Sequence, residues 1–136
     1  MTKQETCKER VGRHLDSRID DIKQLWEADQ AGIEEGVEDL GTFNEYGLSF
    51  DYVSAGTFND QGQGYFRYQI SYGGPSEEFR FYCDPDLECY KIEFWFLDWV
   101  DGACKVLRGE NLDLMLEIYE SFKDCGTIEH LLNEDE

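Results

Sequence analysis

Positive charge is scarce in this sequence. Twelve Lys and Arg residues stand against 31 Asp and Glu residues, which gives a formal net charge of −19 at pH 7. Such a charge opposes direct binding to nucleic acid or to an anionic membrane surface, because both are negatively charged themselves. It favours a basic protein as partner, whose encounter a negative field accelerates. We therefore expect neither nucleic acid nor membrane among the direct partners.

Long hydrophobic runs and an export signal are lacking as well. No stretch approaches the ~20 apolar residues of a membrane-spanning helix, and the first ten residues have no hydrophobic core like that of a signal peptide. We predict a cytoplasmic protein with one domain, residues 1–136. Its hydrophobic share of 40% and aromatic share of 15% are too high for a disordered acidic tail.

Catalytic motifs are missing too. The chain has two His residues: His14 is expected at the edge of the core and His130 in solvent. There is no Gly-x-Ser-x-Gly, no His-Glu-x-x-His and no Gly-rich phosphate loop before a Lys. We predict a non-enzymatic protein without cofactor or metal. The alternative from another class is a metal-dependent enzyme that uses Glu93, Asp98 and Asp101.

The cysteines contain no Cys-x-x-Cys pair, and without an export signal they are expected as reduced, packed thiols. They are Cys7, Cys83, Cys89, Cys104 and Cys125. Cys83 and Cys89 flank the turn-prone segment Asp84-Pro85-Asp86. In a regular hairpin Cys83 projects with Phe81 and Cys89 with Lys91, on opposite faces. This spacing argues against both a zinc pair and a disulfide.

What the chain does contain predicts an α+β fold. Apolar residues recur at three- and four-residue steps and predict a long helix over about residues 3–31, capped by Thr2 with Glu5 and ended by Gly32. This apolar set is Cys7, Val11, Leu15, Ile19, Ile22, Leu25 and Trp26. The charges of this helix nearly balance. The next segment, I-E-E-G-V-E-D-L-G, could form either a short helix or an acidic loop.

Alternating apolar and polar residues then predict a four-stranded antiparallel meander sheet over about residues 47–107. The longest strand begins at Cys89, and its even positions form an apolar row: Tyr90, Ile92, Phe94 and Phe96. We expect this strand to be covered on both sides, by the N-terminal helix and by a C-terminal helix over about 111–124 with Asn111 as N-cap. A short helix or tail follows at 127–136.

Several aromatic residues fall on the sheet face that is otherwise polar: Tyr65, Tyr82, Trp95 and Trp99. The preferred interpretation packs them under the C-terminal helix. In the other interpretation they form an exposed aromatic patch of the kind that anchors protein interfaces.

Negative charge is concentrated in two blocks. Residues 24–66 contain nine acidic residues and no Lys or Arg, and residues 109–136 contain nine acidic residues and one Lys. In the C-terminal helix the acids step by three and four residues and form a stripe about 80° wide, loosely like a row of phosphates. The predicted partner-binding residues are Glu34, Glu35, Glu38, Asp39, Glu110, Asp113, Glu117, Glu120 and Asp124. The alternative interpretation is a solvated acidic surface.

Three runs within residues 44–103 resemble a family of small acidic proteins carried on plasmids and other mobile elements. The runs are E-Y-G-L-S-F-D-Y-V-S-A-G-T-F, G-Y-F-R-Y-Q-I-S-Y-G-G-P-S-E-E-F-R-F-Y and F-W-F-L-D-W-V-D-G-A. The resemblance brings no catalytic residues. It implies a genetic neighbourhood in which inhibitors of restriction and CRISPR enzymes occur, several of them acidic mimics of DNA.

These observations lead to one main hypothesis. We expect a DNA-mimic inhibitor that binds the basic groove of a nucleic-acid-binding defence enzyme, as anti-CRISPR or anti-restriction proteins do. The alternative within the same class is an immunity or antitoxin-type protein that neutralises a basic toxin. A third possibility is an acidic accessory protein that docks in an assembly through its aromatic face.

Overall fold

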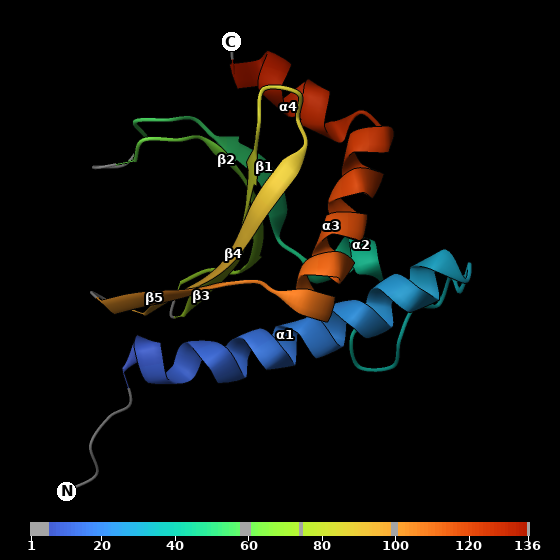
Figure 1. Ribbon diagram of the computed structural model, residues 1–136. Helices are drawn as coiled ribbons and strands as arrows, with labels where there is room; N and C mark the ends of the chain where they lie inside the picture. The colour runs from blue at the N-terminus through green and yellow to red at the C-terminus, as the bar shows by residue number, and fades with distance from the viewer. Residues whose placement is uncertain (1–5, 58–60, 74, 99–100, 136) are drawn as a thin grey trace, which may run out of the picture.

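The computed structural model describes residues 6–57, 61–73, 75–98 and 101–135. The elements in chain order are α1 (Cys7–Gln30), α2 (Phe43–Tyr46), β1 (Ser49–Val53), β2 (Tyr65–Ser71), β3 (Ser76–Cys83), β4 (Cys89–Asp98), β5 (Asp101–Val106), α3 (Gly109–Asp124) and α4 (Thr127–Asp135). The strands form one antiparallel sheet in the order β1-β2-β3-β4-β5. The sheet is curved, and α1 runs beneath it while α3 stands beside it (Figure 1).

The predicted α+β class with an N-terminal and a C-terminal helix is confirmed, but the prediction of four strands is wrong. The additional strand is β5, which pairs with β4 from Asp98↔Asp101 to Glu93↔Val106. Its sequence, D-G-A-C-K-V, has little apolar alternation, and most of its side chains are exposed. Hydrophobicity therefore gives little signal for β5. It becomes a strand because β4 offers an edge with free backbone groups.

Helix α1 has the buried stripe that the spacing predicts, from Cys7 to Trp26. It begins after Thr6, whose Oγ1 accepts a hydrogen bond of 3.2 Å from the backbone N–H of Glu9; the predicted cap at Thr2 lies outside the described residues. Its predicted end is confirmed: Gly32 has a φ of 76° and closes the last turn. Glycine suits this position because a left-handed backbone is strained for other residues.

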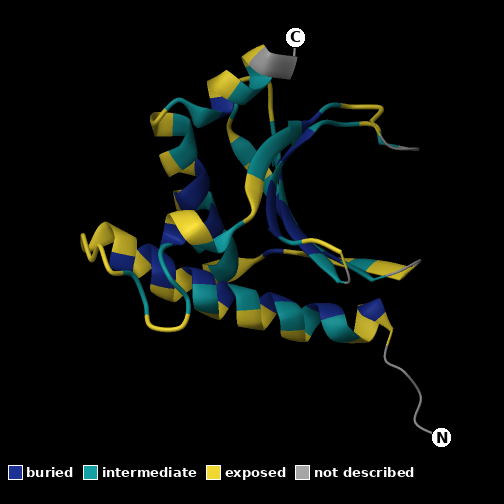
Figure 2. Cartoon of the chain, turned by 180° about the vertical axis from the view of Figure 1, so that it is seen from behind, coloured by how far each residue is buried: buried dark blue, intermediate teal, exposed yellow. Residues whose placement is uncertain are grey.

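The core lies between one face of the sheet and the helices. Phe79, Phe81 and Phe94 are fully buried on this face. The ring of Phe81 lies 5.8 Å from that of Tyr119 in α3, and the ring of Phe96 lies 4.3 Å from that of His14 in α1. Both helices therefore cover the same face, and their buried sides point toward it (Figure 2). The expectation that β4 is covered by a helix on each side is wrong.

The opposite face carries Tyr65, Tyr82 and Trp95, so the expectation that they pack under the C-terminal helix is also wrong. The guanidinium of Arg80 lies 4.0 Å from the ring centroid of Trp95 and 4.7 Å from that of Tyr65. A cation over aromatic rings thus stabilises this face. Trp99 lies outside the described residues. Sequence periodicity separates the two faces of a strand, but it does not say which of them the helices cover.

The apolar row predicted for β4 breaks at Tyr90, which is 56% exposed. The register between β3 and β4 shifts next to Tyr82, so that Cys83 pairs with Cys89. An extra residue in one strand turns the following side chains to the other face. The prediction that Cys83 and Cys89 lie on opposite faces is therefore wrong.

The segment after α1 is the acidic loop, not the short helix. A single bridge between Val37 and Gly41 closes it. Helix α3 begins at Gly109, so the predicted N-cap Asn111 lies inside its first turn. The predicted short terminal helix is present as α4. None of the helices within the described ranges is long and apolar enough to cross a membrane.

Candidate functional site

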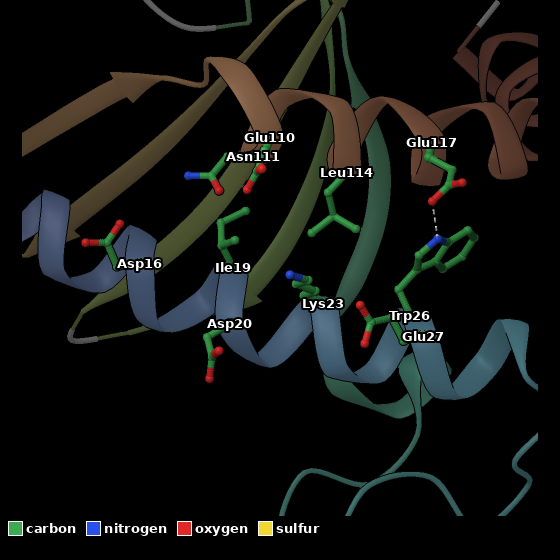
Figure 3. A pocket seen from close by; sticks show the side chains of 10 residues that line it. All are labelled: Asp16, Ile19, Asp20, Lys23, Trp26, Glu27, Glu110, Asn111, Leu114 and Glu117. Carbon is green, nitrogen blue, oxygen red and sulfur yellow. Dashed lines mark hydrogen bonds between the residues drawn. The ribbon is translucent and has the colours of Figure 1, made fainter.

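A groove of about 340 Å³ separates α1 from the first half of α3 (Figure 3). It is lined by Asp16, Ile19, Asp20, Lys23, Trp26, Glu27, Glu110, Asn111, Leu114 and Glu117. We call it the α1–α3 groove. Five of these side chains are carboxylates and one is an amine, so the groove is strongly negative.

The helical repeat places these side chains along the groove. The lining residues of α1 follow one another at steps of one and three residues, next to the buried stripe. The lining residues of α3 have the same spacing. Ile19 and Trp26 are buried and form an apolar floor together with Leu114. Asp16, Asp20 and Glu27 are exposed on the α1 side. Carboxylates therefore rim an apolar base, which suits the aliphatic stem and charged head of a Lys or Arg side chain.

One hydrogen bond crosses the groove. The indole Nε1 of Trp26 donates to Oε2 of Glu117 at 2.7 Å (Figure 3). The bond holds the Glu117 carboxylate in place, but the indole is neutral and does not compensate the negative charge. Since Lys23 is the groove's only cation among its lining residues, most of the negative charge there stays uncompensated.

Five other cations form ion pairs away from the groove. The ion pairs in the described part of the chain include Arg10–Asp98 at 2.7 Å, Arg18–Glu77, Arg67–Asp51 at 2.7 Å, Arg80–Glu78 at 2.8 Å and Lys123–Glu88 at 3.0 Å. None of these ten residues lines the α1–α3 groove. These four arginines thus pair with acids of the sheet and not with the carboxylates that line the groove.

The predicted residues of α3 divide into two groups. Glu110 and Glu117 line the groove, whereas Asp113, Glu120 and Asp124 are exposed on α3 outside its lining. The three acids outside extend the negative surface along the helix.

The predicted residues of the first acidic block lie apart from this groove. They are exposed in the loop between α1 and α2: Glu34, Glu35, Glu38 and Asp39. The first turns of α3 pass in front of α1 in Figure 1, and the loop passes in front of α1 when the molecule is seen from behind (Figure 2). The loop therefore lies on the opposite side of α1 from the first turns of α3. Of these four loop residues, only Glu34 contributes to the lining of a second, smaller cavity of about 220 Å³ near Phe43.

Sequence reasoning missed Asp16, Asp20 and Glu27. The charges of the first helix nearly balance in number. The balance hid the fact that these three acids face α3 while Arg10 and Arg18 turn toward acids of the sheet. The available signal was the spacing of these acids beside the apolar stripe. It could not be used without knowing which helix lies opposite.

The carboxylates of the enzyme alternative are each engaged in a different contact. Glu93 accepts from the indole of Trp95 at 3.0 Å, and Asp98 from Arg10 at 2.7 Å. Asp101 accepts the backbone N–H of Cys7 at 2.9 Å, which lowers the pKa of its carboxyl. Among the residues that the structure describes, no cluster of three or more His, Cys, Asp or Glu side chains is arranged to hold a metal ion.

Comparison with known proteins identifies no relative: no family model, no curated protein and no solved structure matches this chain. Inferences about function therefore depend on the chemistry of the site.

Proposed function

We propose that the protein is a non-enzymatic acidic binding protein that occupies the basic nucleic-acid-binding surface of a defence enzyme, with its carboxylates in place of phosphates. The observation that carries the proposal is the α1–α3 groove, where five carboxylates surround an apolar floor and meet a single Lys. A partner's Lys or Arg side chain would place its stem on Leu114 and Trp26 and its charge between the carboxylates.

The spacing of the acids supports mimicry of a phosphate row. On α3, residues three or four positions apart lie ~5–6 Å from each other, and the stripe from Glu110 to Asp124 continues beyond the groove. Like charges at these steps destabilise a helix slightly. The row of acids therefore lowers the stability of α3 slightly and provides a regular line of negative charge.

The overall charge supports rapid association. A net charge of −19 creates a negative field that steers a basic partner toward the protein. Both steering and the final contacts weaken as salt screens the charges, over a Debye length of ~10 Å at 0.1 M. Binding should therefore fall steeply as ionic strength rises.

The test uses a fluorescent octalysine peptide as probe and two variants with equal net charge. The groove variant combines Asp16→Asn, Asp20→Asn, Glu27→Gln and Glu110→Gln. The loop variant combines Glu34→Gln, Glu35→Gln, Glu38→Gln and Asp39→Asn. Fluorescence anisotropy at several salt concentrations gives the affinity and its dependence on salt.

We expect the groove variant to lose at least roughly tenfold more affinity than the loop variant, which corresponds to ~1.4 kcal/mol. The salt dependence should also flatten in the groove variant. Equal losses in both variants would show that net charge alone attracts the peptide, and binding that does not change with salt would contradict phosphate mimicry. A duplex DNA that competes with the protein for a basic enzyme then separates mimicry from binding of a basic toxin.

A further inference from the structure

The tip of the β3–β4 hairpin brings two thiols together. Cys83 ends β3, Cys89 begins β4, and the two are direct partners in the register. A tight turn joins them: the carbonyl of Asp84 accepts the N–H of Leu87 at 2.9 Å, and the N–H of Asp84 donates to the carbonyl of Glu88 at 3.0 Å. Opposite residues of antiparallel strands have Cβ atoms ~4.5–5.5 Å apart. A disulfide needs ~3.5–4.5 Å, so a small shift suffices to form one.

Tyr119 of α3 covers the two cysteines on the side that faces the core. The Sγ of Cys83 lies 3.0 Å from the hydroxyl of Tyr119, which in turn donates to the carbonyl of Leu87 at 2.8 Å. Tyr119 is fully buried, whereas Cys83 and Cys89 are half-buried. The thiols are thus held in place from the protein interior and remain reachable from solvent.

The two thiols differ in character. The hydrogen bond from Cys89 lowers the pKa of Cys83, and the charge of Lys123 acts in the same direction. The hydroxyl of Tyr119 also lowers it when its hydrogen turns from the Leu87 carbonyl to the sulfur. The hydrogen bond to Cys83 and burial raise the pKa of Cys89. The pair therefore ionises first at Cys83, while Cys89 keeps its proton. A thiolate beside a protonated thiol is the usual arrangement of an attacking and a resolving cysteine.

We propose that Cys83 and Cys89 form a redox-active dithiol that is oxidised by peroxides, with Cys83 as the attacking and Cys89 as the resolving residue. The Cys83 thiolate attacks one peroxide oxygen, the O–O bond breaks, and the leaving hydroxide or alkoxide takes up a proton as water or an alcohol. This leaves Cys83 as a sulfenic acid. The sulfur of Cys89 then attacks that of Cys83, forms the disulfide and releases water. Two electrons pass from the thiols to the peroxide. A dithiol reductant then returns the protein disulfide to two thiols and becomes a disulfide itself.

This site is independent of the acidic groove and does not depend on the proposed function. Tyr119 projects from the sheet-facing side of α3, where its ring stacks on Phe81, whereas Glu117 and Glu110 line the groove on another side of the same helix. A disulfide between Cys83 and Cys89 would link the two ends of a short turn and would leave every carboxylate of the groove in place.

The test treats the reduced full-length protein with hydrogen peroxide, blocks the remaining thiols with iodoacetamide and digests it with trypsin without reduction. Cleavage after Arg80 and Lys91 releases one peptide, residues 81–91, that contains both cysteines. Two peptides with one cysteine each serve as internal controls: residues 92–105 contain Cys104, and residues 124–136 contain Cys125. Both control cysteines are exposed.

We expect peptide 81–91 to lose two hydrogens and both alkylation sites at peroxide doses that leave Cys104 and Cys125 alkylated. A peptide 81–91 that keeps both free thiols while the exposed cysteines oxidise would overturn the proposal. Accumulation of sulfinic acid at Cys83 without a disulfide would overturn it as well.

Variants test the two roles. In Cys89→Ser the sulfenic acid should persist at Cys83, where dimedone traps it, whereas Cys83→Ser should leave Cys89 unlabelled. Tyr119→Phe removes the hydroxyl beside Cys83 and should slow disulfide formation by a factor on the order of three to ten. Tyr72→Phe is the matched control, because Tyr72 is 82% exposed. Equal dimedone labelling of both Cys variants, or an unchanged rate in Tyr119→Phe, would contradict the assignment.

Discussion

The indole nitrogen of Trp26 donates a hydrogen bond of 2.7 Å to the carboxylate of Glu117 and so joins α1 to α3 across the acidic groove. Trp26 is 6% exposed, and its ring packs edge-on against Phe43 at 5.1 Å. The bond therefore connects the groove directly to the core. It holds the two helices that carry the candidate binding residues.

This contact should contribute measurably to stability. Glu117→Ala leaves the N–H of a buried indole without its acceptor, which we expect to lower the free energy of unfolding by about 1–2 kcal/mol. Glu120→Ala makes the same change at an exposed position of the same helix and should stay within about 0.5 kcal/mol of the unsubstituted protein. Urea unfolding measures both. Equal effects would show that the bond adds nothing.

The carboxylate of Glu77 should contribute more to the free energy of unfolding than that of Glu117. It is 2% exposed, accepts from Nε of Arg18 and lies 2.8 Å from Nδ1 of His14. Glu77→Gln leaves the Arg18 guanidinium without its counter-charge, and we expect a loss of about 2–3 kcal/mol, because Arg18 retains some contact with water.

The matched control for Glu77→Gln is Glu88→Gln, which removes a carboxylate from the exposed pair with Lys123. Such surface pairs contribute ~0–1 kcal/mol. Chemical unfolding of both variants in the same buffer makes the comparison. A cost for Glu88→Gln as large as that for Glu77→Gln would contradict the assigned role of burial.

Alkaline pH should destabilise the fold through its tyrosines. Burial raises the pKa of Tyr46 to about 12, and its hydrogen bond to Asp21 acts in the same direction. An unfolded tyrosine ionises near ~10. The stabilising contribution of Tyr46 is therefore complete below pH ~10 and is lost as the pH rises from there to about 12.

Urea midpoints measured between pH 9 and pH 12 check this expectation. In Tyr46→Phe the decline over this range should become shallower, although burial also raises the pKa of Tyr68 and Tyr119. Tyr72→Phe should follow the unsubstituted protein, since Tyr72 is 82% exposed. A slope for Tyr46→Phe identical to that for Tyr72→Phe would refute the assignment.

The stability of the acidic loop between α1 and α2 should depend on Gly36. Its φ is 78°, and a Cβ at this position would lie 2.2 Å from the carbonyl oxygen of Gly41. Gly56 has a similar φ of 82°, but a Cβ there would meet no atom within 4 Å. Both Gly→Ala changes cost about 1–2 kcal/mol of backbone strain, and Gly36→Ala should cost roughly 1–3 kcal/mol more because of the clash.

Thermal unfolding of Gly36→Ala and Gly56→Ala gives the difference. The groove lies on the other side of α1 from the loop, so octalysine affinity should change little in either variant. Similar melting temperatures for the two variants would indicate that the loop yields to the added methyl group.

Several features of the fold could be predicted because their cause is local. Helix α1 follows from apolar residues three and four positions apart, and Gly32 ends it because a left-handed residue is needed there. The meander of β1 to β4 follows from alternation and short turns. In contrast, β5 could not be predicted from its own residues, because it is a strand through pairing with β4.

The candidate site could be predicted only in part. The acidic stripe of α3 is a property of one helix, so Glu110 and Glu117 could be identified from spacing alone. Asp16, Asp20 and Glu27 could not, since their role depends on which helix lies opposite them. The prediction that Cys83 and Cys89 project on opposite faces is wrong, because a register shift in the hairpin changes the face to which a side chain points.

The charge of −19, the positions of the long helices and the α+β class follow from composition and short-range periodicity alone. Three relationships became visible only in the folded chain: both long helices cover the same sheet face, their acids meet in one groove, and Cys83 lies beside Cys89. The first two relationships depend on packing between elements far apart in the chain, and the third depends on a register shift within the β3–β4 hairpin. Local periodicity carries no information about such contacts.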